Sequence, residues 1–237
     1  MLQNSMLFNW INAIRNDPVD GIITMLMQIV ANLGALILHE VAHGYVALWC
    51  GDPTAKMLGR LSLNPARHLD PIGTAMMLLL GVGFAKPVPV NPRNFRNYRR
   101  DDLLVSLAGV TMNMLLFLVS GFLYVLCSRW FHETNGFLSQ VLYYLYQFFG
   151  MFSSLNLGLA LFNLLPIPPL DGYHVLNDIV LKGRLQLSPD LFRMFQLGLM
   201  ALLVFTNVVD RLLFTLRSAV WTPVMQFFST IVFGRGF

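Results

Sequence analysis

Charged side chains are scarce in this chain. Asp, Glu, Lys and Arg make up 12% of its 237 residues, whereas about a quarter of an average globular chain is charged. Hydrophobic residues make up 56%. A soluble chain of this size must cover its surface with charge, so the composition excludes a soluble enzyme, a secreted scaffold and a disordered tail. It predicts an all-α protein that crosses a membrane several times, folded as one membrane-embedded domain over residues 1–237.

Cysteine is also scarce, since the chain has only Cys50 and Cys127. They fall near opposite ends of different apolar segments, so we expect no disulfide between them. The first twenty residues lack the charged, apolar and small-residue order of a cleavable signal peptide, so the first apolar run is expected to be a retained helix. The net charge of +4 is small and concentrated in one connection, so we expect no nucleic-acid partner.

Four apolar segments are long enough to cross a bilayer as helices, which takes roughly 20 residues. They span residues 21–50, 103–127, 138–165 and 191–216. A shorter run with several glycines, residues 72–85, is predicted to be re-entrant or interfacial. The last apolar segment, residues 219–233, is interrupted by Pro223. It is expected either to lie at the interface or to complete a further span.

Lys and Arg are unevenly distributed among the connections, which predicts the orientation. The connection between the first two predicted spans holds eight of the 16 basic residues, and Lys182, Arg184 and Arg193 mark that between the third and fourth. Arg129 alone lies in the connection between the second and third. Both basic connections are therefore expected in the cytoplasm, with the N-terminus outside. We favour a solvated loop for the arginine-rich stretch over a dedicated anionic-lipid site.

One group of chemistry-bearing residues lies inside the first predicted span. The sequence His39-Glu40-Val41-Ala42-His43 places two imidazoles four residues apart, so both face one side of a helix and can bind one zinc ion. Glu40 is offset by one residue and can act as general base on a water that zinc activates. Ionisable side chains inside a membrane span cost free energy unless they bind a metal, pair with another charge or face water. We therefore favour a zinc site over the alternative of interhelical hydrogen bonds from the histidines beside a neutral Glu40.

A catalytic zinc site takes three protein ligands and keeps one position open for water. Asp171 is the candidate third ligand. It follows three prolines that end the third predicted span on the same side as the end of the first, so the chain can turn back into the bundle there. Asn163 would lie at a similar depth, where its amide could hydrogen-bond a substrate carbonyl or oxyanion. The alternative is that Asp171 is a turn residue, because Leu-Asp-Gly is a common turn sequence.

These motifs, H-E-x-x-H and N-x-x-P-x-x-x-L-D-G, together resemble the site-2 protease family of intramembrane zinc metalloproteases. Residues 51–71 are similar to the stretch after the active-site helix in compact bacterial members. Residues 106–113 resemble the family's A-G-P-x-x-N element, with Val110 where proline is usual. This resemblance covers residues 31–180 and implies a role for each site residue. The zinc ligands correspond to His39, His43 and Asp171, the catalytic base to Glu40, and a further active-site polar residue to Asn163.

The resemblance implies an intramembrane zinc metalloprotease with one Zn²⁺ per chain, multi-pass in the bacterial inner membrane, with its active site toward the cytoplasm. Members of the family cut transmembrane segments of single-span proteins or clear signal-peptide remnants, so these and the lipid bilayer are the implied partners. No stretch is long and polar enough for the PDZ or CBS domain of larger members. A compact member is therefore expected, with its catalytic core over residues 21–180 and no indicated oligomeric state.

Residues 85–92 alternate proline with valine and cannot be helical. They could form an edge strand of a small β-hairpin near the active site, to which an unwound substrate would add by main-chain hydrogen bonds. A proline-stiffened loop is an equally good interpretation. Among the remaining polar residues, Asn113 and Asn156 are expected to form interhelical hydrogen bonds. His174 could orient Asp171 without binding zinc itself.

Two other functions are consistent with the same residues. The first is a multi-pass zinc carrier or sensor, in which the ligands bind metal without hydrolysis. The second is a membrane scaffold that has no catalytic activity and binds no zinc. Replacement of Glu40 by Gln separates the first from a protease, because a carrier would still transport zinc. Metal analysis of the purified protein separates the second.

Overall fold

The computed structural model describes residues 6–80, 86–182, 185, 187–206 and 208–234. These residues are mainly helical. The α-helices are α1 (Met6–Asn16), α2 (Pro18–Cys50), α3 (Thr54–Met57), α4 (Pro71–Leu80), α5 (Tyr98–Glu133), α6 (Phe137–Asn163), α7 (Asp171–Ile179), α8 (Pro189–Phe205) and α9 (Val208–Phe233). Short 3-10 helices occupy Pro65–Arg67 and Pro92–Asn94. The all-α prediction is confirmed.

The β-hairpin expected near residues 85–92 is not formed within the described part of the chain, which contains no strand. Residues 86–91 belong to no helix or strand. Asn91 is extended, and the prolines that follow Lys86 and Val88 disfavour a helical conformation there, so we call these residues the extended segment. Among the described residues, one backbone bond, from the Lys86 N–H to the His68 carbonyl at 2.8 Å, joins this segment to the preceding loop. The prolines limit the number of backbone donors in this stretch, so a regular ladder cannot form. The predicted re-entrant run is helix α4 as far as Leu80, and its residues 81–85 lie outside the described residues.

Three of the predicted spans are single helices long and apolar enough to cross a membrane, namely α2, α5 and α6. Their ends follow ordinary capping rules. The Asp17 carboxylate accepts from the N–H groups of Val19 and Asp20 at the start of α2, and Pro18 occupies the first helical position. Gly51 ends the helix with φ of 109°, a left-handed conformation that favours glycine.

The fourth predicted span, residues 191–216, is not one helix. Helix α8 ends at Phe205 and α9 begins at Val208, and the two axes differ by 78°. Thr206 leaves the helix in an extended conformation, and its hydroxyl donates to the Leu202 carbonyl at 2.6 Å. Together the bent pair would count as one further span. Helix α9 continues through Pro223 to Phe233, so residues 219–233 form its second half and not a separate segment.

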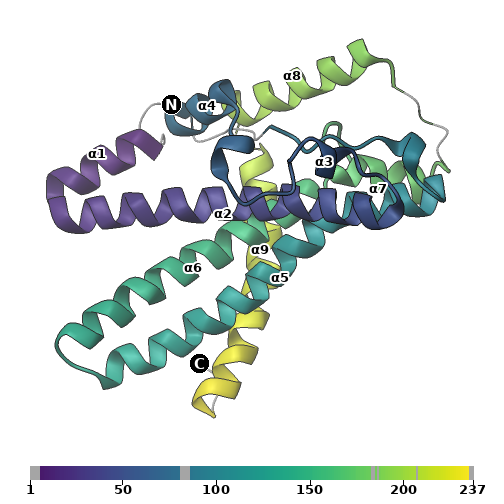
Figure 1. The fold of residues 1–237 in the computed structure, drawn as a ribbon. Coiled ribbons are helices and arrows are strands. Elements are labelled where there is room, and N and C mark those ends of the chain that lie inside the picture. The colour runs from purple at the N-terminus through teal and green to yellow at the C-terminus, as the bar shows by residue number, and fades with distance from the viewer. Residues whose placement is uncertain (1–5, 81–85, 183–184, 186, 207, 235–237) are drawn as a thin grey trace.

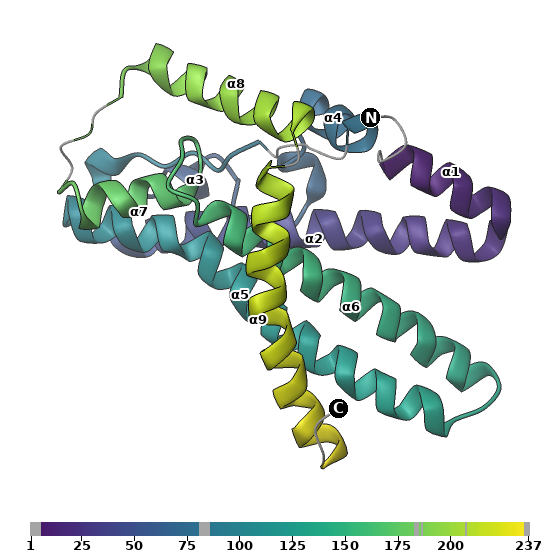
Figure 2. The same ribbon diagram turned by 180° about the vertical axis from the view of Figure 1, so that it is seen from behind.

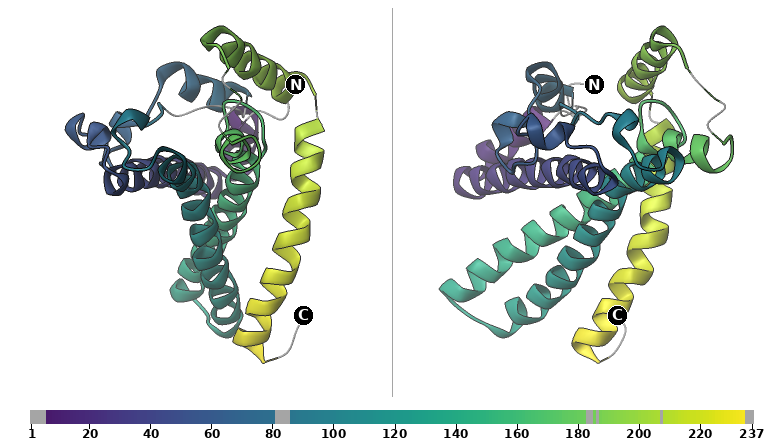
Figure 3. Two further views of the ribbon diagram at one scale, coloured as in Figure 1. Left: turned by 90° about the vertical axis from the view of Figure 1, so that its right-hand side faces the viewer. Right: turned by 45° about the vertical axis from the view of Figure 1, so that its right-hand side comes forward.

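Helices α5 and α6 form a long antiparallel hairpin, and α9 packs along it (Figures 1 and 2). Their contact is filled by buried apolar side chains, including Phe117 and Leu157, neither of which is exposed, and Met225. Helix α2 crosses the first half of α5, while α1 folds back along α2. The left view in Figure 3 shows the N-terminal end of α9 standing away from the hairpin, while its C-terminal end lies close to it. This leaves α2, the start of α5 and α7 gathered at one end of the molecule.

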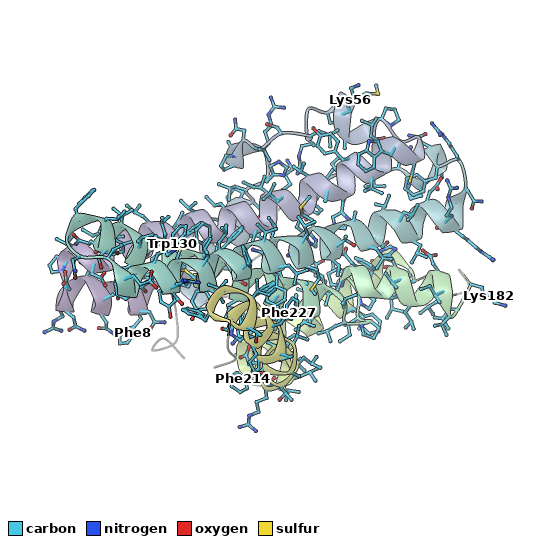
Figure 4. All side chains as sticks on the ribbon, turned by 90° about the horizontal axis from the view of Figure 1, so that it is seen from below. Phe8, Lys56, Trp130, Lys182, Phe214 and Phe227 are labelled. Atoms are coloured by element: carbon cyan, nitrogen blue, oxygen red, sulfur yellow. The ribbon has the colours of Figure 1, made fainter. Side chains whose placement is uncertain are left out.

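The two basic connections meet at that same end. Arg99 donates from Nη2 to the Lys182 carbonyl at 2.8 Å. Figure 4 places Lys56 and Lys182 towards one end of the molecule, with Phe8 and Trp130 towards the other. The expectation that both basic connections lie on one side of the membrane therefore agrees with how the chain folds.

Candidate metal centre

The two histidines of α2 face each other across one turn. Their Nε2 atoms are 3.0 Å apart. Asp171 is the first residue of α7, and its Oδ2 lies 3.4 Å from Nε2 of His39 and 3.5 Å from Nε2 of His43. The structure thus brings together three potential ligands from sequence positions more than 120 residues apart.

The spacing of these atoms suits one zinc ion. Ligands about 2.05 Å from a tetrahedral zinc are about 3.3 Å from one another, close to the three separations measured here. His43 Nδ1 lies 2.7 Å from the Val105 carbonyl. That carbonyl can only accept, so Nδ1 carries the proton and the Nε2 lone pair faces the centre. Asp171 Oδ2 is buried and has no hydrogen-bond partner. A buried carboxylate oxygen in that state is suited to a metal ion.

The electrostatics of Asp171 also fit a ligand. Burial raises the pKa of a carboxyl group, but the neighbouring imidazoles of His39 and His43 outweigh that effect, and the pKa of Asp171 lies below its ordinary value. The carboxylate is therefore ionised, and an ionised carboxylate is the form that binds zinc.

A tight turn carries Asp171 to the histidines. Helix α6 ends at Asn163, and a loop with three prolines leads to α7. A Cβ on Gly172 would lie 2.3 Å from the Leu164 carbonyl oxygen, a separation that only glycine permits without moving the backbone. The Tyr173 hydroxyl donates to the Leu185 carbonyl at 3.0 Å. The first contact fixes the start of α7 against the end of α6, and the second ties it to the chain that follows α7.

Helix α5 contributes space at the site. A Cβ built on Gly109 would lie 2.4 Å from both His39 Cε1 and His43 Nε2. Any side chain here would displace the imidazoles. The role of Gly109 was not predictable from the sequence, because the need for glycine arises from the contact between α5 and α2.

Gly109→Ala is therefore expected to weaken zinc binding by more than about tenfold. The added methyl group overlaps both rings, and a metal site tolerates displacements of only about 0.5 Å. Competition with a chelator would measure the change. Gly158→Ala is the matched control, because a Cβ there meets nothing within 4 Å. Equal zinc affinity in the two variants would show that the rings do not depend on this close approach.

Glu40 lies beside the ligands and contacts the extended segment. Its Oε2 accepts from the Val88 N–H at 2.8 Å. The segment can approach this closely because Gly44, one turn further along α2, has no side chain. A Cβ on Gly44 would lie 2.4 Å from Leu61 Cδ2 and 3.1 Å from Val88 Cγ1. The carboxylate is thus held between the zinc ligands and the extended segment.

Asp52 anchors the far end of that segment. It is fully buried and accepts from the Asn91 N–H and from Asn94 Nδ2, both at 2.7 Å, and from the Thr54 N–H at 3.1 Å. Burial raises the pKa of Asp52, but these hydrogen bonds outweigh it and lower the pKa below its usual value. Arg60 holds the near end by donating to the carbonyls of Lys86 and Pro87. These partners of Asp52 were not predictable, because nothing local in the sequence indicates them.

Two predicted polar residues have other partners. Asn163 donates from Nδ2 to the Leu159 carbonyl of its own helix at 3.0 Å. One N–H of the Asn163 amide is therefore already used within α6. The hydrogen bond from Asn163 to a substrate carbonyl or oxyanion stays a prediction. His174 Nδ1 lies 3.7 Å from Asp102 Oδ2 on α5. His174 therefore pairs with Asp102, a carboxylate of α5, and this contact joins α7 to α5.

Comparison with known proteins agrees with this chemistry. The model of peptidase family M50 matches residues 135–206. YwhC of Bacillus subtilis is 49% identical over 146 residues, which cover 62% of this chain and 65% of YwhC. Rip2 of Mycolicibacterium smegmatis is 29% identical over 173 residues, which cover 71% of this chain and 62% of Rip2. Rip2 of Mycobacterium tuberculosis (strain H37Rv) is 31% identical over 157 residues, covering 64% and 56%.

All three relatives are named as zinc metalloproteases. The matched part of this chain spans less than two thirds of the length of each of them. No solved structure matches the chain.

Proposed function

Because the chain belongs to peptidase family M50, the site-2 proteases, we propose that it is a zinc metalloprotease that hydrolyses peptide bonds in membrane-embedded segments of other proteins. The observation that carries this proposal is the convergence of His39, His43 and Asp171 beside Glu40. Single-span membrane proteins and signal-peptide remnants are the proposed substrates.

Each residue of the site has a distinct part in the proposed reaction. His39 and His43 would hold zinc through Nε2, and Asp171 through Oδ2. When bound, zinc supplies a Lewis acid that polarises the scissile carbonyl and makes water acidic enough to attack at neutral pH. Glu40 would accept a proton from the attacking water and later donate it to the leaving amine. The carboxylate is aimed for this task because the Val88 N–H fixes one of its oxygens.

The extended segment 86–90 is the proposed platform for substrate. A peptide bond in a helix must unwind before water can reach it, and the freed backbone groups need partners in a water-poor site. An extended backbone can supply such partners by main-chain hydrogen bonds. Support for this comes from the position of Val88, which contacts the catalytic carboxylate directly. A substrate strand beside the segment would therefore lie close to both the base and the metal.

Val88→Pro is expected to slow cleavage by about 10- to 100-fold while zinc stays bound. The substitution removes the N–H that orients Glu40, and a hydrogen bond to a charged group contributes about 1.5–3 kcal/mol. Val88→Ala keeps the N–H and is expected to cleave at close to the wild-type rate. Val90→Pro leaves the bond to Glu40 in place, so a slowing in that variant reports on the substrate edge alone. Wild-type turnover in both proline variants would contradict the platform.

We place the active site on the cytoplasmic side of a bacterial inner membrane. The basic residues between α2 and α5 lie at the end of the molecule that carries the site, and Arg99 joins them to the loop after α7. Basic loops are retained in the cytoplasm during membrane insertion. A protease added from the cytoplasmic side of inverted vesicles should therefore cleave the chain between residues 52 and 97.

A comparison of membranes tests the proposed activity in cells. Membranes from cells that carry the wild-type chain and from cells with Glu40→Gln would be compared for single-span fragments. We expect such fragments to accumulate in the variant, because their final cleavage requires the general base. Identical fragment patterns, with zinc transport preserved in the variant, would favour a carrier instead.

A further inference from the structure

Several buried polar atoms behind the zinc ligands have no hydrogen-bond partner in the described part of the chain. They are Nδ1 of His39, both Nδ2 and Oδ1 of Asn113, and Oδ1 of Asn156. Asn113 and Asn156 are fully buried, and His39 is 6% exposed. An unpaired buried amide is costly, and in a native structure it indicates a bond made in another state or an ordered water.

The three residues lie on three helices that contact one another, α2, α5 and α6. Asn113 follows Gly109 by one turn on the same face of α5, and Gly109 is the residue whose Cβ would contact His39, 2.6 Å from Nδ1. One turn further, the Phe117 carbonyl accepts from Ser153 Oγ of α6 at 2.9 Å. Because α5 and α6 run antiparallel (Figure 1), this bond sets a register in which Asn156, three residues after Ser153, is level with Asn113, one turn before Phe117. Asn113 is thus one turn from the contact with the His39 imidazole and level with the Asn156 amide of α6.

The donors and acceptors of these groups are complementary. Nε2 of His39 faces the other ligands, so Nδ1 carries the proton and donates. Asn113 offers an acceptor, Oδ1, and a donor, Nδ2. Asn156 Nδ2 already donates to the Phe152 carbonyl at 2.8 Å, which leaves its Oδ1 as an acceptor. One chain of bonds from His39 to Asn113 and then to Asn156 would pair all four of these atoms.

We propose that Asn113 is a positioning residue for the zinc site. Its Oδ1 accepts from the His39 Nδ1–H, directly or through one water, and its Nδ2 donates to Asn156. The chain fixes the tautomer and ring plane of His39, as the Val105 carbonyl does for His43. The inference rests on the proposed zinc site. It gives His39 an outer hydrogen bond of the kind that His43 already makes with the Val105 carbonyl.

Substitution of Asn113 separates positioning from packing. Asn113→Leu is similar in size but cannot accept from His39, so zinc affinity is expected to fall about 10- to 100-fold. Asn113→Asp keeps an acceptor oxygen and is expected to bind zinc as tightly as the wild-type chain, or more tightly. Asn156→Leu removes only the outer bond and should cause a smaller loss. Zinc dissociation constants would be measured by competition with a chelator on purified protein in detergent.

Asn32→Leu provides a matched control. Asn32 is a buried amide on α2, two turns before His39, and donates to the Gln28 carbonyl. Its replacement should leave zinc affinity unchanged. The thermal stability of metal-free Asn113→Leu should not fall, because an apolar side chain replaces an amide that has no partner in that state. If Asn113→Leu does not fold, the zinc affinities of Asn113→Asp and Asn156→Leu test the inference instead. It then requires that Asn113→Asp binds zinc at least as tightly as the wild-type chain and that Asn156→Leu binds it less tightly.

Three outcomes are distinct. A zinc dissociation constant for Asn113→Leu within twofold of wild type would overturn the inference while leaving the proposed function intact. Equal losses in the Leu and Asp variants would also overturn it, because they would show a packing effect. A wild-type chain that binds no zinc would instead contradict the proposed function itself.

Discussion

Glu40→Gln is expected to lower the rate of peptide cleavage by about 10²- to 10⁴-fold while one zinc ion per chain is retained. The amide has the shape of the carboxylate, and its oxygen can still accept from the Val88 N–H. It cannot take a proton from water, so only the acid–base step is lost. Cleavage of a purified single-span substrate in detergent, together with metal analysis, would measure both properties.

Glu133→Gln is the matched control for this prediction. Glu133 is the other glutamate of the chain. It lies at the end of α5, largely exposed, with its Oε1 3.7 Å from Arg129 Nε. An exposed pair of this kind contributes little to stability, so activity should stay within twofold of wild type. Cleavage by Glu40→Gln within tenfold of the wild-type rate would require a different base.

Asp171→Ala is expected to abolish stoichiometric zinc binding and, with it, cleavage. Only His39 and His43 would remain, and two imidazoles hold zinc more than about 100-fold less tightly than a complete three-ligand site, a loss larger than that from removing an outer hydrogen bond. The thermal midpoint of the wild-type chain should rise when zinc is added, because a ligand that binds the folded state stabilises it. That rise should be absent in the variant.

Asp178→Ala provides the comparison on the same helix. Asp178 lies two turns after Asp171 on α7, where burial and the nearby Asp102 raise its pKa to about 6. It is not a member of the ligand group. Its replacement should leave both the zinc content and the zinc-induced rise in thermal midpoint unchanged. Stoichiometric zinc in Asp171→Ala would exclude Asp171 as a ligand.

The parts of the site that were predictable from sequence are those set by local spacing. Two histidines four residues apart in an apolar run must share a helix face, whatever surrounds them. Asp171 followed from a chemical requirement, because zinc needs a third ligand and a proline-rich turn could return one to the bundle. The structure brings these three residues together although most of the chain separates Asp171 from the other two.

The remaining features depend on contacts between helices. The need for glycine at position 109 and the hydrogen bonds of Asp52 appear only when α5 and the loop after α2 are packed against α2. The break between α8 and α9 was missed because residues 191–216 are apolar on average in spite of Asn207, Asp210 and Arg211, and average hydropathy does not register a change of backbone direction at Thr206. Residues 86–91 are not helical, as expected, but their partners are side chains and loop carbonyls in place of a second strand.

X-ray absorption of the zinc-loaded, purified chain tests the central claim most directly, because it reports the ligand atoms themselves. We expect a first shell of nitrogen and oxygen atoms at about 2.0–2.1 Å with the signature of two imidazoles, and no sulfur. Both cysteines, Cys50 and Cys127, are free and buried. A sulfur shell at about 2.3 Å, or a shell with a single imidazole, would contradict the assignment of His39, His43 and Asp171 as the zinc site.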